Sequence, residues 1–177
     1  MPLLLCLAFL IDASHHHRSV ISIELFGMEE LARSLGVSVT FGALPPGWWG
    51  AFRYMSRTVT MRAGLSVAQF RSVLAHELGH AHLGHTGNHP PHSKQESAAD
   101  RFAAKHLVRM DDYHSALAMH GLDIDATARE LRVMPWVVQD FARSMSGSLY
   151  SRVGMPAPVV EGKQTLDPRL QRVTLDS

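Results

Sequence analysis

Apolar residues recur at a helical spacing in the middle of the chain, between residues 66 and 83. They form one stripe, which comprises Phe70, Leu74, Leu78 and Ala81. Ser66 precedes the stripe and is a natural N-cap, because its hydroxyl can accept a bond from an unpaired backbone N–H of the first turn. The pattern therefore predicts a long core helix that begins after Ser66 and runs to about Leu83.

Shorter patterns before this helix predict one more helix and a small sheet. Residues 28–35 have the amphipathic spacing of a short helix, which Gly36 would end. Residues 37–41 alternate and are rich in β-branched side chains, which indicates a strand. Residues 49–54 and 58–62 predict two further strands joined by a short turn. We therefore expect a small antiparallel sheet packed on the long helix.

The pattern after the long helix is helical up to about residue 146. Two glycines and two prolines in residues 84–91 predict a loop. Further helices are expected at residues 94–108, 112–120, 125–131 and 135–145. From residue 147 onward no period is present, which predicts a loose tail. Sheet and helices together place the chain in the α+β class.

Length and composition suit one core of ordinary size, since 46% of the 177 residues are hydrophobic and 19% are charged. We divide the chain into an N-terminal extension of uncertain structure (1–27), a core domain (28–110), a C-terminal helical part (111–146) and the tail (147–177). The apolar run Leu3–Ile11 is too short to span a bilayer and lacks the flanking features of a signal peptide. It suits either a buried strand or an upstream extension.

Charge and cysteine content narrow the range of functions. The formal net charge is +1, so the overall balance favours neither nucleic acid nor an anionic membrane as partner. Cys6 is the single cysteine, which excludes an intramolecular disulfide and fits a reducing cytoplasm. Histidine is the anomaly, because six of the twelve histidines lie between His76 and His92. Candidate chemistry is therefore concentrated in that segment.

The segment His76-Glu77-Leu78-Gly79-His80 has the pattern of a catalytic zinc helix. Residues four apart share a helix face, so His76 and His80 can both bind one ion. Glu77 lies too far round the helix to join them comfortably, but it can reach a water molecule on the ion as a general base. We therefore predict one Zn²⁺ per chain and a catalytic Glu77. The alternative is a helix at the solvent edge with two ordinary histidines.

A catalytic zinc site needs a third protein ligand and one open position. His82 is excluded because it lies about 200° round the helix from His80. Three other histidines sit on or beside the predicted loop: His85, His89 and His92. They could line the cleft, bind a surface metal or have no role.

Glu96 is the better candidate for the third ligand, since Glu96 and Asp100 lie four apart on one face of the next helix. Glu96 would bind the metal, and Asp100 would accept the free ring N–H of a ligand histidine. A structural alternative exists for both carboxylates. Ser93 and Glu96 also match a capping box, and Asp100 could be a solvated surface acid.

These residues resemble the ImmA/IrrE family of bacterial and phage metallopeptidases. The resemblance rests on the zinc-helix segment together with Glu96-x-x-Ala99-Asp100-x-Phe102-Ala103-Ala104, and it spans about residues 28–110. It implies a small zincin-like fold in which His76, His80 and Glu96 bind zinc and Glu77 is the catalytic acid and base. It also implies site-specific cleavage of a partner protein, often a transcriptional repressor, in the cytoplasm. The chain departs from the family at residues 106–109, where an apolar-Pro ending is usual.

Hydrolysis also needs a place for the substrate backbone and a group that stabilises the oxyanion. We expect the strand at 58–62 to bind substrate by edge pairing. Candidates for the electrophilic group are Tyr54, Arg101, His106 and Tyr113.

Two functions of other classes remain open. Residues 125–131 and 135–145 have the spacing of a helix-turn-helix, which would suit a zinc-binding transcriptional regulator. Basic and acidic residues balance over 123–152, however, and a reader of DNA phosphates should be basic, so we expect a plain helical cap. The other possibility is a non-hydrolytic protein that binds a partner through its C-terminal helices. Glu77 argues against it, because such a site has no use for a base.

Overall fold

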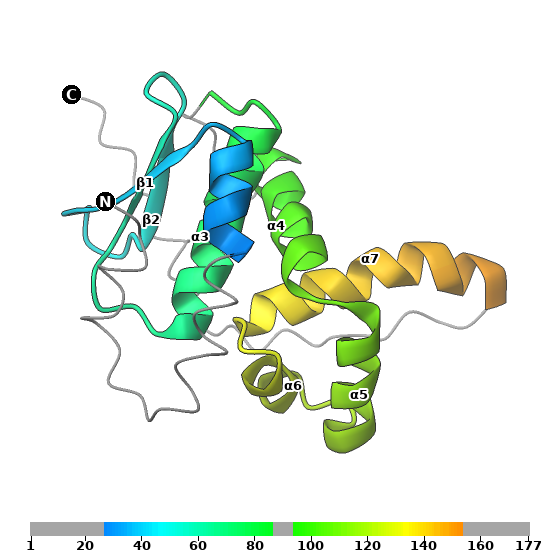
Figure 1. The fold of residues 1–177 in the computed structure, drawn as a ribbon. Coiled ribbons are helices and arrows are strands. Elements are labelled where there is room, and N and C mark those ends of the chain that lie inside the picture. Colours follow the sequence, from blue (N-terminus) through cyan, green and yellow to red (C-terminus); the bar gives the residue numbers. More distant parts are fainter. Residues whose placement is uncertain (1–26, 87–93, 154–177) are drawn as a thin grey trace.

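The computed structural model describes residues 27–86 and 94–153, which form an α+β fold (Figure 1). A helix over 27–34 precedes the strands, which are β1 (Ser38–Phe41), β2 (Gly50–Arg53) and β3 (Thr58–Met61). The helices that follow are α3 (Val67–His82), α4 (Lys94–Leu107), α5 (Met110–His120), α6 (Ile124–Glu130) and α7 (Pro135–Val153). These elements occur in the order predicted from the sequence. The apolar run near the N-terminus and most of the predicted 84–91 loop lie outside the described residues.

The sheet is mixed, so the prediction of a wholly antiparallel sheet is wrong. Its strand order is β1-β3-β2, with β3 parallel to β1 and antiparallel to β2. The loop over 42–49 carries the chain past the place that β3 later fills, and a tight turn then returns β3 between its two neighbours. Side-chain alternation predicts that a strand exists but not which strands lie beside it.

The central place of β3 overturns a second expectation. Because β3 pairs on both sides, it has no edge with which to bind a substrate. Of the two edge strands among the described residues, β1 and β2, it is β2 that packs against α3. The carbonyl of Trp49, just before β2, accepts the N–H of Arg62, just after β3, at 2.9 Å. In an antiparallel pair, the backbone groups of successive residues point alternately toward the partner strand and away from it. The backbone N–H of Phe52 is therefore directed away from β3, at the outer edge of β2.

Helix α3 is the centre of the fold and is buried on all sides over residues 70–81. Its N-terminus is closed by a capping box, in which the hydroxyl of Ser66 accepts the Gln69 N–H and the Gln69 side chain accepts the Ser66 N–H. The sheet lies on one side of α3 and α4 on the other (Figure 1). Every residue of the predicted stripe is buried, and Val59 and Met61 of β3 complete this core.

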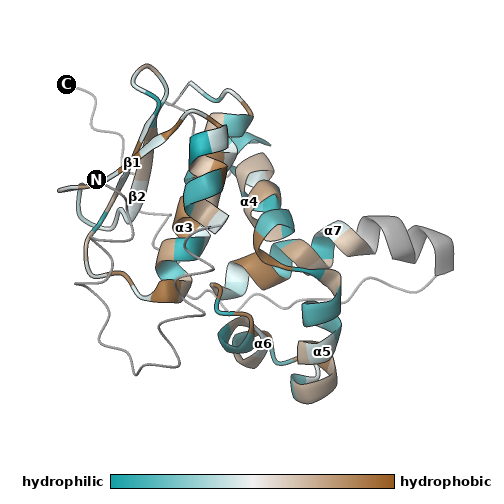
Figure 2. Cartoon of the chain, in the orientation of Figure 1, coloured by the Kyte–Doolittle hydropathy of each residue, from teal (hydrophilic) through white to brown (hydrophobic). Residues whose placement is uncertain are grey.

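A second group of apolar side chains joins α4 to the C-terminal helices. Hydrophobic positions on α4 and at the start of α7 are brown in Figure 2. Its buried members are Ala104, Val108, Ala128, Val133, Val137, Val138 and Phe141. Helix α7 continues to Val153, so the predicted start of the tail at residue 147 was too early. The chain has no proline between Pro135 and Pro156, and a single glycine costs a helix only about 1 kcal/mol. No helix of the described residues is both long and apolar enough to cross a membrane.

Candidate metal centre

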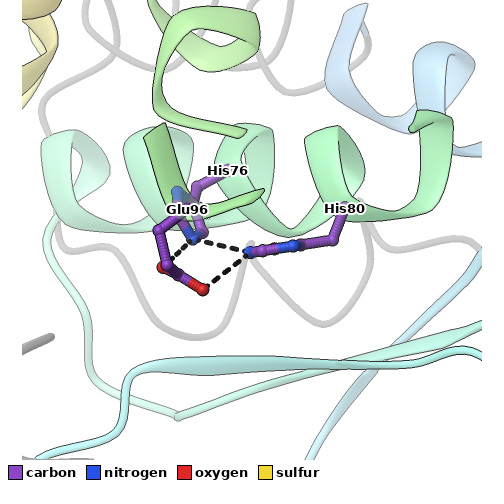
Figure 3. Close-up of side chains that lie close together, drawn as sticks. All are labelled: His76, His80 and Glu96. Atoms are coloured by element: carbon purple, nitrogen blue, oxygen red, sulfur yellow. Dashed lines mark hydrogen bonds and ion pairs between the residues drawn. The ribbon is translucent and has the colours of Figure 1, made fainter. Parts of the chain in front are cut away.

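Three predicted ligands, His76, His80 and Glu96, converge between α3 and α4 (Figure 3). The Nε2 atoms of the two histidines are 3.0 Å apart. The Glu96 carboxylate spans both rings, with Oε2 at 3.3 Å from Nε2 of His76 and Oε1 at 3.4 Å from Nε2 of His80. His76 and His80 are each only 3% exposed. One turn of α3 and the first turn of α4 therefore present two nitrogens and a carboxylate to a single point.

These distances fit a tetrahedral zinc site. Zinc binds imidazole nitrogen and carboxylate oxygen at about 2.0–2.2 Å, and tetrahedral angles then place neighbouring ligand atoms about 3.4 Å apart. The three separations in the structure, 3.0, 3.3 and 3.4 Å, lie close to that value. Two imidazoles and a carboxylate are also donors that zinc accepts readily in catalytic sites. The residues present thus suit a divalent metal ion with one position left for water.

Asp100 lies behind His76, on the side away from Glu96. Its Oδ1 is 2.8 Å from Nδ1 of His76, whereas Glu96 contacts Nε2 of the same ring. Burial is the largest single influence and lowers the pKa of His76. The hydrogen bonds to Asp100 and Glu96, together with the negative charges of Glu77 and Asp100, outweigh it and raise that pKa to about 9. The metal-free His76 is therefore protonated at neutral pH, and a metal ion must displace that proton to bind.

Glu96 contacts both imidazoles instead of facing solvent. Ser93, its partner in the alternative capping box, lies outside the described residues. The Glu96 side chain is 13% exposed. The Asp100 side chain is 18% exposed and bonded to His76, so Asp100 is not the solvated surface acid of the alternative interpretation.

Glu77 is held by the sheet. Its Oε2 accepts the backbone N–H of Phe52 on β2, at 2.9 Å, and the residue is 3% exposed. Gly50 on the same strand permits this approach, because a Cβ there would lie 2.5 Å from Val73 and 3.2 Å from the Cγ of Glu77. A strand that the sequence predicted only as part of a sheet therefore orients the predicted base.

The remaining histidines separate into different environments. His82 packs against Phe102 of α4, with ring centroids 4.9 Å apart. His85 instead reaches back to His80, and the two Nδ1 atoms are 2.8 Å apart. Burial lowers the pKa of His85. His89 and His92 lie outside the described residues.

The sequence interpretation missed one neighbour of the site and left another unresolved. Trp136, at the start of α7, packs edge-on to His76 with ring centroids 6.0 Å apart. No periodic pattern links Trp136 to the zinc helix, so nothing in the sequence pointed to it. For His85 a signal existed in Gly84, whose φ of +70° is typical of a helix C-terminus that folds back.

The four candidates for oxyanion stabilisation lie in varied settings. Tyr54 is 39% exposed at the end of β2, and Arg101 is exposed on α4. The ring of His106 stacks on Phe102, with centroids 3.9 Å apart. Tyr113 packs against Phe141 in the second apolar group. None of these contacts singles out one candidate.

Comparison with known proteins identifies a matching protein family. The model of a family described as Peptidase_M78, IrrE N-terminal-like domain, matches residues 32–140. This range includes the sheet, both helices that carry the three converging side chains, and the first part of α7. No curated protein and no solved structure matches the chain.

Proposed function

Because the chain belongs to the Peptidase_M78 family of IrrE N-terminal-like domains, we propose that it is a zinc-dependent endopeptidase. The family supports a metallopeptidase, and the observation that carries the choice of zinc is the separation of the three donor atoms. His76, His80 and Glu96 would hold the ion, as the distances of 3.0 to 3.4 Å between their donor atoms suit tetrahedral coordination.

Glu77 is the proposed catalytic acid and base. A bound zinc ion would lower the pKa of a water molecule and polarise the carbonyl of the bond to be cleaved. Glu77 then accepts a proton from the attacking water at one carboxylate oxygen and returns it to the nitrogen that leaves when the C–N bond breaks. The hydrogen bond from the Phe52 N–H to Oε2 fixes the orientation of that carboxylate during both transfers.

We also propose that the substrate binds as an extended segment along β2. Phe52 directs its N–H away from β3 and toward Glu77, so this edge of the sheet faces the catalytic carboxylate. An extended peptide added to β2 would therefore run past the metal centre. Hydrogen bonds to outward main-chain groups of β2 other than the Phe52 N–H, which Glu77 occupies, would set its register. Such a segment suits an exposed loop or linker of a partner protein, and a cytoplasmic transcriptional repressor is the partner that we favour.

The test of hydrolysis compares the wild type with Glu77→Gln on a library of peptides. Both proteins should contain zinc, because the substitution removes the base but none of the three ligands. The wild type should create new peptide N-termini, detected by mass spectrometry, and Glu77→Gln should create none. Glu130→Gln is the matched control, since Glu130 lies on α6 beside His120 and should leave cleavage unchanged.

Glu77→Gln also serves to find the partner. A protein cleaved by the wild type should accumulate, intact, on immobilised Glu77→Gln and should be cut after wild-type protein is added. Zinc-loaded wild type that cleaves no more than Glu77→Gln would refute the peptidase. Purified protein that binds iron in preference to zinc would refute the choice of metal, because two histidines and a carboxylate also form iron sites.

A further inference from the structure

We propose that His85 is a positioning residue that holds His80 in the orientation and tautomer needed for metal binding. The proposal rests on the metal site described above. It concerns a residue whose role the zinc-helix pattern leaves open, since His85 lies after the end of α3.

The first argument is the geometry of the two rings. Nε2 of His80 faces the centre of the site, 3.0 Å from His76 and 3.4 Å from Glu96. Nδ1 of His80 is on the other side of the ring and lies 2.8 Å from Nδ1 of His85. A neutral imidazole carries its proton on one nitrogen only. For Nε2 to offer a lone pair to a metal, the proton must be on Nδ1, and Nδ1 of His85 is placed to accept it.

The backbone places His85 independently of that ring contact. Helix α3 ends in a turn in which Gly84 has a φ of +70°, a conformation that favours glycine. The His85 N–H donates to the His80 carbonyl at 3.0 Å, the closing bond of a Schellman motif. The same two residues are thus joined through backbone and side chain. The turn that ends α3 thus places Nδ1 of His85, a hydrogen-bond acceptor, beside the ring of His80.

The arrangement parallels that of His76. Asp100 contacts Nδ1 of His76, and His85 contacts Nδ1 of His80, so each imidazole has a partner on the nitrogen that faces away from the metal centre. This placement also argues against His85 as a ligand. A group in contact with Nδ1 of His80 is across the ring from an ion at Nε2.

The test separates the acceptor of His85 from its bulk. His85→Asn keeps an acceptor near the place of Nδ1, whereas His85→Phe keeps a ring without an acceptor. Zinc affinity is measured by competition with a chromophoric chelator, on protein shown to be folded by circular dichroism. We expect His85→Phe to bind zinc about tenfold more weakly than the wild type. His85→Asn should stay near the wild type, and so should the control His82→Ala.

Cobalt(II) supplies a readout that bulk alone would not change. The visible spectrum of the Co²⁺-loaded His85→Asn protein should match that of the wild type, because the ligand set is the same. Loss of affinity in His85→Asn with full affinity in His85→Phe would show that His85 acts by packing, and it would overturn the proposal. If the Co²⁺ spectra of both variants indicated coordination by one fewer histidine than in the wild type, His85 would be a ligand, and the proposal would be overturned as well. Failure of the wild type to bind zinc would instead refute the metal site itself.

Discussion

A single methyl group at position 79 should weaken metal binding without touching any ligand. Gly79 lies between His76 and His80, the two proposed ligand histidines of α3, and faces α4. A Cβ at this position would lie 3.1 Å from both the Cα and the carbonyl oxygen of Ala99, and 3.2 Å from the Cβ of Phe102. Two of these three atoms are backbone, so no side-chain rotation can relieve the contact. In Gly79→Ala, helix α4 must move away from α3.

The size of the movement decides the effect. At contact distances of 3.0 to 3.4 Å, the neighbouring atoms of Ala99 and Phe102 must move by a few tenths of an ångström. Metal–ligand distances are held to about ±0.2 Å, so a shift of α4 on that scale displaces Glu96 by as much as the site tolerates. Overpacking costs about 1–3 kcal/mol, while replacing a helical glycine by alanine returns about 1 kcal/mol. Stability should therefore change little, and we expect a roughly tenfold loss of zinc affinity.

Chelator competition and thermal unfolding, measured on the same protein, distinguish these two effects. Gly27→Ala is the matched control, because a Cβ at Gly27 meets nothing within 4 Å. It should leave zinc affinity unchanged. If Gly79→Ala bound zinc as tightly as the wild type and as Gly27→Ala, the close approach of α3 and α4 would not set the geometry of the site. A large fall in melting temperature together with unchanged affinity would refute the reasoning in the same way.

Two further predictions concern the ligands. Loss of the hydrogen-bond partner of a metal ligand typically lowers metal affinity roughly 10–100-fold, and Glu96→Ala, which removes a ligand itself, should lower zinc affinity by more. The control Glu130→Ala should leave zinc affinity unchanged. Full zinc content in Glu96→Ala would show that the third ligand lies elsewhere. The pKa of His76 is raised in the folded, metal-free protein from 6.5 to about 9, so its stabilising charge is fully present below pH 6.5 and is lost as the pH rises through 9. Urea unfolding in EDTA should show a decrease of roughly 3 kcal/mol at most across that range, absent in His76→Gln; a wild-type stability that is flat or rises would contradict the assignment.

Local features of the fold could be predicted because their causes are local. Ser66 accepts the Gln69 N–H as an N-cap, and Gly36 and Gly84 adopt the positive φ angles that end helices. The spacing of His76 and His80 follows from helix geometry alone, whatever surrounds the helix. Such features depend on residues within about four positions along the chain, and these can be read directly from the sequence.

Features that depend on packing could not be predicted in the same way. The order β1-β3-β2 follows from the path of a loop, and side-chain alternation does not record that path. The contact between the Phe52 N–H and Glu77 uses a backbone group, which every residue except proline possesses. Trp136 meets His76 across sixty residues of chain, and no local sequence pattern relates two positions so far apart.

The contact between α3 and α4 is what distinguishes a metal centre from a pair of helical histidines. His76 and His80 would share a face on any helix, but a carboxylate reaches them only if a second helix comes close enough. Gly79 and Ala99 permit that approach because neither carries more than a methyl group. Asp100 follows Ala99 directly, so the residue at the contact and the partner of His76 move together. Gly79 and Ala99 are therefore part of the site, because their close contact determines how near Glu96 comes to His76 and His80.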